Sequence, residues 1–132
     1  MDLKELLKKT VEQGQWINIR ETGGQWVLTL DLKGGRKQTI EVRPFSENGV
    51  AFARLRTRIS AATELTGQRP LAALRMNANL AYGSLVVDGD DYVMQETIMV
   101  AESTPAHLLA SLQYLATVAD QQEKFLSGKD KH

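Results

Sequence analysis

Three arginines stand at alternate positions between Phe52 and Arg58. Because alternate residues of a β-strand point to one face of a sheet, Arg54, Arg56 and Arg58 should form a basic stripe with Phe52 beside it. Guanidinium groups bind carboxylates and phosphates. The stripe could therefore contact an acidic protein or peptide, or a nucleic acid. The other interpretation is a solvated outer face whose charges are paired with Glu41, which the balanced net charge favours.

A second group of candidate ligands lies in the sequence Asp88-Gly89-Asp90-Asp91, which Glu96 follows. Clustered carboxylates suggest a calcium loop, but a calcium-binding hand places its glycine sixth, whereas this glycine is second and the glutamate follows too soon. The segment is instead typical of a turn between strands. We predict no metal site here.

The remaining residues that could take part in catalysis stand alone. His107 is the only histidine outside the C-terminal tail, and the chain has no cysteine. The pairs Gly23-Gly24 and Gly34-Gly35 join predicted strands and lack the lysine and the helix of a phosphate-binding loop. We therefore predict that the protein is not an enzyme and carries no cofactor.

Charge and composition limit the classes of partner. Sixteen basic residues balance sixteen acidic ones, so no long-range field draws the 132-residue chain to nucleic acid or to an anionic membrane. The absence of cysteine fits a reducing compartment, and no apolar run is long enough to span a bilayer. We expect a cytoplasmic protein with a single domain over residues 1–132, an ordered core from about residue 2 to 126, and a frayed tail at 127–132.

The elements that position these residues follow from the hydrophobic periodicity. The spacing predicts an amphipathic helix from Leu3 to near Gly14, with Asp2 as its cap. From Trp16 the period changes to 2, which indicates strands. A loop at residues 22–25 pairs Ile19 with Leu28 in the first hairpin.

Two further strands follow, and their register depends on the loops. An odd-length loop at residues 34–36, with a glycine in the left-handed conformation, would pair Leu30 with Ile40. A turn at residues 46–49 would then place Glu41 opposite Arg54.

The second half of the chain alternates helix, hairpin and helix. Pro70 suits the first turn of a short helix over residues 69–78, whose apolar stripe consists of Leu71, Leu74 and Ala78. Strands at residues 82–87 and 92–100 flank the aspartate-rich turn. Thr104 then caps a long final helix.

The final helix is apolar around much of its circumference. Leu108, Leu112, Leu115 and Ala119 form one stripe, and Tyr114, Val118 and Phe125 extend it. One face packed on a sheet does not use so much apolar surface. The surplus is either a wide buried seam within the monomer or a surface for a dimer or another partner.

The predicted order is α-β-β-β-β-α-β-β-α. Hairpins with helices between and beside them indicate an α+β fold, an antiparallel sheet with flanking helices.

This order and the segment from Leu74 to Asp88 resemble the type III secretion chaperone-like superfamily, which includes the YbjN-type bacterial proteins. The resemblance lies in the Leu-x-x-Asn of Leu74 and Asn77, in Tyr82-Gly83, in Asp88-Gly89, and in the long helix from Leu108 to Phe125. It implies a compact sandwich that dimerises and binds other proteins without chemistry. Secretion chaperones hold an extended effector segment by apolar patches and strand addition.

We therefore predict a chaperone-like or adaptor protein that acts as a homodimer and binds a protein or peptide partner. Nucleic-acid binding through the arginine stripe is the alternative. The side chains predicted to contact the partner come from the sheet and from the last helix: Phe52, Arg54, Arg56, Arg58, Tyr114, Val118 and Phe125.

Overall fold

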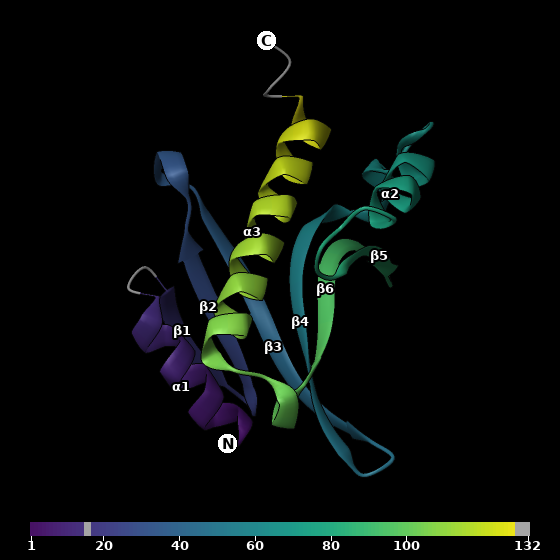
Figure 1. Ribbon diagram of the computed structural model, residues 1–132. Helices are drawn as coiled ribbons and strands as arrows, with labels where there is room; N and C mark the ends of the chain where they lie inside the picture. Colours follow the sequence, from purple (N-terminus) through teal and green to yellow (C-terminus); the bar gives the residue numbers. More distant parts are fainter. Residues whose placement is uncertain (15–16, 129–132) are drawn as a thin grey trace.

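The computed structural model describes residues 1–14 and 17–128 of the chain (Figure 1). Trp16, predicted near the start of the first strand, and residues 129–132 of the predicted tail lie outside the described residues. The elements are α1 (Leu3–Gln13), β1 (Ile17–Thr22), β2 (Gln25–Asp31), η1 (Lys33–Gly35), β3 (Lys37–Glu47), β4 (Val50–Ala61), η2 (Ala62–Glu64), α2 (Arg69–Asn77), β5 (Ser84–Asp88), β6 (Asp91–Met99), η3 (Val100–Glu102) and α3 (Pro105–Ser127).

The strands form one antiparallel sheet of six, in the order β1-β2-β3-β4-β6-β5. Helix α3 crosses one face of this sheet with α1 beside it, and α2 lies at the β5 end (Figure 1). The predicted α+β class and element order are confirmed. No helix within residues 1–14 and 17–128 is long and apolar enough to cross a membrane.

Both long helices begin at the predicted caps. The Asp2 carboxylate accepts a hydrogen bond of 2.9 Å from the backbone N–H of Glu5, and the Thr104 hydroxyl accepts one of 3.1 Å from the N–H of His107. These bonds satisfy N–H groups that have no partner within a first helical turn.

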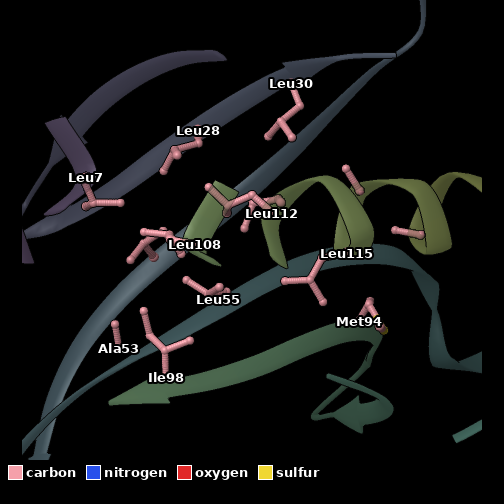
Figure 2. Packing of buried hydrophobic residues seen from close by; sticks show 14 of the residues in the cluster. Leu7, Leu28, Leu30, Ala53, Leu55, Met94, Ile98, Leu108, Leu112 and Leu115 are labelled. Atoms are coloured by element: carbon pink, nitrogen blue, oxygen red, sulfur yellow. The ribbon is translucent and has the colours of Figure 1, made fainter. Parts of the chain in front are cut away.

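The core lies between the sheet and the two helices α1 and α3. Leucines dominate it, and Figure 2 shows Leu108, Leu112 and Leu115 of α3 pointing toward the strands. On the sheet the inward side chains alternate with outward ones, as the period of 2 predicts. The inward set includes Leu28, Leu30, Ile40, Val42, Ala53, Leu55, Met94 and Ile98.

The register of the first hairpin is as predicted, but that of the second is not. Ile19 pairs with Leu28. Leu30 pairs with Gln38 and not with Ile40. The turn η1 begins one residue earlier than expected, at Lys33, so the register shifts by two residues. Its loop still has an odd length, so the same side chains face the core.

The pairing of β3 with β4 also differs from the prediction, and this difference concerns the arginines. The turn has only two residues, Asn48 and Gly49, both with positive φ (53° and 77°). Such a primed turn matches the twist of its strands and favours Asn-Gly. Glu41 consequently lies opposite Arg56, and the predicted pairing of Glu41 with Arg54 is wrong.

The Asn77 side chain of helix α2 forms hydrogen bonds to the edge strand β5. The Asn77 amide donates to the Leu85 carbonyl at 3.0 Å and accepts from the Leu85 N–H at 2.7 Å. Nearby, Gly83 has φ +68°, and a Cβ there would lie 2.6 Å from the Gln95 carbonyl oxygen. The Asn and Gly of the resemblance motif therefore have structural roles in joining α2 to the sheet.

Candidate functional site

The arginine stripe lies on the outer face of the sheet, opposite the core. This outer face carries side chains of β3 and β4 that alternate with the buried ones: Glu41, Arg43, Phe45, Phe52, Arg54, Arg56 and Arg58. The three stripe arginines have different surroundings. Arg54 and Arg58 are exposed, whereas Arg56 is buried.

Arg56 is surrounded by carboxylates. Its Nε donates to Asp88 Oδ2 at 3.1 Å and its Nη2 to Asp91 Oδ2 at 3.3 Å, while Nη1 lies 3.8 Å from Glu41 Oε1. Only 10% of its side chain is exposed. A guanidinium removed from water in this way requires such partners, so Arg56 holds the β5–β6 turn against β4.

Arg58 is paired as well. Its Nε donates to Asp91 Oδ1 at 2.7 Å. The hydrogen bond from Arg58 lowers the pKa of the Asp91 carboxyl, and Arg56 contributes to the same shift. Two aspartates of the loop considered as a metal site, Asp88 and Asp91, thus serve as partners for arginines. Within the described ranges, no group of three His, Cys, Asp or Glu side chains could hold a metal ion.

Arg54 is held by an aromatic ring and a hydroxyl group. Its guanidinium carbon lies 4.6 Å from the centroid of the Phe45 ring, and its Nε donates to Thr97 Oγ1 at 3.3 Å. Phe45 stacks on Phe52 with 5.3 Å between the ring centroids. Phe52 and Arg54, both predicted contact residues, are therefore brought together by Phe45.

Phe45 was missed by sequence reasoning, although the signal that could have found it was present. Asn48-Gly49 is the strongest short-range hairpin signal, and a two-residue turn there places Phe45 directly opposite Phe52 and Arg43 opposite Arg54.

The residues predicted on α3 fall in three different environments. Val118 is buried in the core. Tyr114 is half-buried, packs edge-on against Tyr82, and accepts a hydrogen bond of 3.0 Å from the Ala81 N–H. Phe125 is 54% exposed. Most of the apolar surplus of α3 therefore lies within the monomer, and Phe125 is the predicted contact residue that remains at the surface.

Helix α2 adds apolar surface that the sequence did not assign to a partner. Its stripe residues Leu71 and Leu74 are 42% and 66% exposed, and Val87 of β5, which lines the same hollow as Leu74, is exposed as well. A hollow of about 440 Å³ between α2 and β5 is lined by Leu74, Leu85 and Val87. A smaller one of about 150 Å³ separates α2 from Phe125. We call Leu71, Leu74, Val87 and Phe125 the α2 surface.

His107 has no catalytic arrangement around it in the described part of the chain. Its ring packs against the Tyr82 ring, with 5.5 Å between the two ring centroids. Glu96, a carboxyl on which His107 acts electrostatically, accepts a hydrogen bond of 3.2 Å from Ser111 Oγ. Burial raises the pKa of the Glu96 carboxyl, and Ser111 and His107 oppose that shift. Ser111 is fully buried, so this cluster belongs to the seam between α3 and β6.

Two solved structures share this arrangement of elements. The type III secretion chaperone SycH of Yersinia pestis, solved in complex with a stable fragment of YscM2, aligns with a TM-score of 0.66 at 15% identity over 89% of this chain and 97% of that one. A chain of the HopA1–SchA chaperone–effector complex aligns with a TM-score of 0.64 at 14% identity over 92% of each chain.

Sequence comparison adds no further relative. No protein-family model matches the chain, and no curated protein matches it. The likeness in structure establishes the secretion-chaperone fold that the motifs indicated.

Proposed function

We propose, from the secretion-chaperone fold of this chain, that the protein is a non-enzymatic, chaperone-like binding module of the bacterial cytoplasm. It acts as a homodimer and holds a protein partner. The two chaperones of the same fold were each solved with a protein ligand, a fragment of YscM2 for SycH and an effector in the HopA1–SchA complex. That likeness supports a partner of the same kind for this chain.

The α2 surface is the observation that carries the proposal. Leu74 alone is 66% exposed, and it borders the apolar hollow beside β5. Apolar side chains grouped around a hollow are typical of an interface, whereas isolated exposed ones need no explanation. We assign this surface to the second copy of the chain, because a two-fold interface requires one self-complementary patch on each subunit.

The partner contacts are assigned to the outer face of the sheet. Of the side chains predicted there, Phe52, Arg54 and Arg58 are at least partly accessible and are retained in the proposal. Arg56 is occupied by three carboxylates and has a structural role. Phe125 is retained as part of the α2 surface.

Light scattering after size-exclusion chromatography tests the dimer. The wild-type chain should elute with the mass of two 14.7 kDa subunits, and Leu71→Glu should shift it to one. Met99→Glu is the matched control, because Met99 is also 42% exposed but belongs to β6. A wild-type monomer, or equal dissociation by both variants, would contradict the assignment.

Affinity capture tests the protein partner. The tagged protein should retain one stoichiometric protein from extract of its own cells, identified by mass spectrometry. Arg54→Glu should release this protein, while Lys4→Glu, an exposed charge reversal on α1, should retain it. If the folded wild-type dimer retains no protein, the proposed chaperone-like function is contradicted.

A further inference from the structure

The outer face contains a hollow of about 460 Å³ between β3, β4 and the β5–β6 hairpin. Its walls combine cations, amides and one aromatic ring. The residues used below are Gln25, Arg43, Phe45, Arg54, Arg56 and Gln95. A hollow lined in this way differs from the apolar hollows around α2, and it calls for a polar ligand.

The cations of the hollow are unequally neutralised. Arg56 has three carboxylates around it. Arg43 has one, since its Nη2 donates to Glu41 Oε2 at 2.6 Å, and its Nε is buried without a hydrogen-bond partner in the part of the chain that the structure describes. Arg54 contacts a hydroxyl and a ring, and no carboxylate among the described residues pairs with it. The hollow thus holds an excess of positive charge at Arg54.

Arg43 and Arg54 also face each other directly across the two strands. Like charges at directly opposed positions destabilise a β-sheet pair. Here Glu41 compensates Arg43, while the Phe45 ring holds the Arg54 guanidinium in position. A bound anion beside Arg54 would relieve the repulsion that remains.

We propose that this hollow binds a carboxylate side chain of an acidic peptide segment. The carboxylate pairs with the Arg54 guanidinium, which offers several N–H donors in a planar fork suited to that group. The methylene stem lies against the Phe45 ring, and Gln25 and Gln95 hydrogen-bond to the peptide backbone. This inference rests on the proposed function, since it specifies the chemistry of the protein partner.

A peptide fits the hollow better than a nucleic acid. Asp88 lines the same hollow and Glu41 pairs with Arg43 and Arg56, so a chain of phosphates would meet carboxylates in and beside the hollow. A single carboxylate needs only the Arg54 guanidinium. The balanced charge of the whole chain likewise provides no field for a polyanion.

NMR titration of the ¹⁵N-labelled protein tests the site with two blocked tripeptides, acetyl-Ala-Glu-Ala-amide and acetyl-Ala-Gln-Ala-amide. We expect the glutamate peptide to shift the Nε–H signal of Arg54 saturably and the glutamine peptide to leave it unchanged. Arg54→Gln should weaken binding by about tenfold or more. Arg20→Gln is the matched control, because Arg20 is an exposed arginine of β1 that does not line the hollow, and it should leave the affinity within about twofold.

Three results would overturn the proposal. They are equal shifts with both peptides, equal weakening by the two arginine variants, or tighter binding of an oligothymidylate whose affinity falls steeply with salt. Because the backbone spectrum reports whether each variant is folded, loss of binding is assigned unambiguously. A dimer that does not bind the glutamate peptide would refute this site alone, and a monomer that binds it would refute the dimer alone.

Discussion

Replacement of Asn77 by alanine tests how α2 is attached to the sheet. Strand β5 is at the edge of the sheet, so one of its sides has no neighbouring strand. The Asn77 amide bonds there to both the N–H and the C=O of Leu85, as a neighbouring strand would. Leu85 is buried, with its side chain in the core. Asn77→Ala therefore removes two hydrogen bonds and leaves two backbone groups without a protein partner.

The magnitude follows from those two bonds. Each contributes about 0.5–1.5 kcal/mol net, so their loss should lower the free energy of unfolding by about 1–3 kcal/mol. Alanine favours helix over asparagine by up to about 0.5 kcal/mol, which offsets part of this loss. We expect a net decrease of about 0.5–2.5 kcal/mol, and the upper end of this range is a substantial share of the stability of a domain of this size.

Asn79→Ala provides the control. Asn79 lies two residues beyond the end of α2, is exposed, and its side chain makes no hydrogen bond to the described residues. Urea unfolding followed by circular dichroism should show a loss for Asn77→Ala and almost none for Asn79→Ala. Hydrogen exchange should show faster exchange of the Leu85 amide in the first variant only.

Two outcomes would refute this reasoning. If both variants lose the same stability, the two bonds contribute nothing beyond helix propensity. If the Leu85 amide still exchanges slowly in Asn77→Ala, another group must accept its hydrogen bond. The α2 surface should also depend on this anchor, so Asn77→Ala should weaken the proposed dimer in the same light-scattering assay.

Three further predictions concern backbone, charge and pH. Gly83→Ala should lower the free energy of unfolding by about 2–4 kcal/mol in urea, because its Cβ would meet a backbone oxygen at positive φ; a loss below that of Asn77→Ala would contradict this. Arg56→Ala should cost about 1–3 kcal/mol and Arg58→Ala clearly less, since only Arg56 is buried; equal losses would show that burial is irrelevant. Burial raises the pKa of Glu96, so ionisation of this carboxyl lowers the free energy of unfolding. This loss of stability is absent below the ordinary pKa of 4.5 and develops as pH rises through the raised pKa. Glu96→Gln should therefore gain stability relative to wild type between pH 4 and pH 7 in denaturant titrations, and a pH-independent difference would refute this.

The sequence predicted most of the fold because its local signals agree with each other. The caps Asp2 and Thr104 and the alternation along β1 and β2 placed these elements correctly. The registers of β2 with β3 and of β3 with β4 were wrong because a shift by two residues keeps the same side chains on the same face, so hydrophobic pattern alone does not distinguish them.

The site was harder to predict because its properties depend on that register. The stripe was correctly placed on the outer face, but the partners of Arg56 come from the β5–β6 turn, a segment about thirty residues away in sequence. Val118 was predicted to contact a partner but is buried, because helical spacing along α3 does not reveal which other elements cover that side of the helix. The contact residues, the homodimer and the YbjN-type assignment stay predictions.

The balance of charge on the outer face has a consequence for the speed of association. Around the stripe four arginines, Arg43, Arg54, Arg56 and Arg58, lie among three carboxylates, those of Glu41, Asp88 and Asp91, so this cluster has an excess of one positive charge. Such a face exerts little attraction beyond a Debye length of about 8 Å at physiological salt. A partner should therefore arrive at an unsteered rate, about 10⁵–10⁶ M⁻¹s⁻¹, that barely changes with ionic strength. Discrimination between partners would then lie in how long each complex lasts.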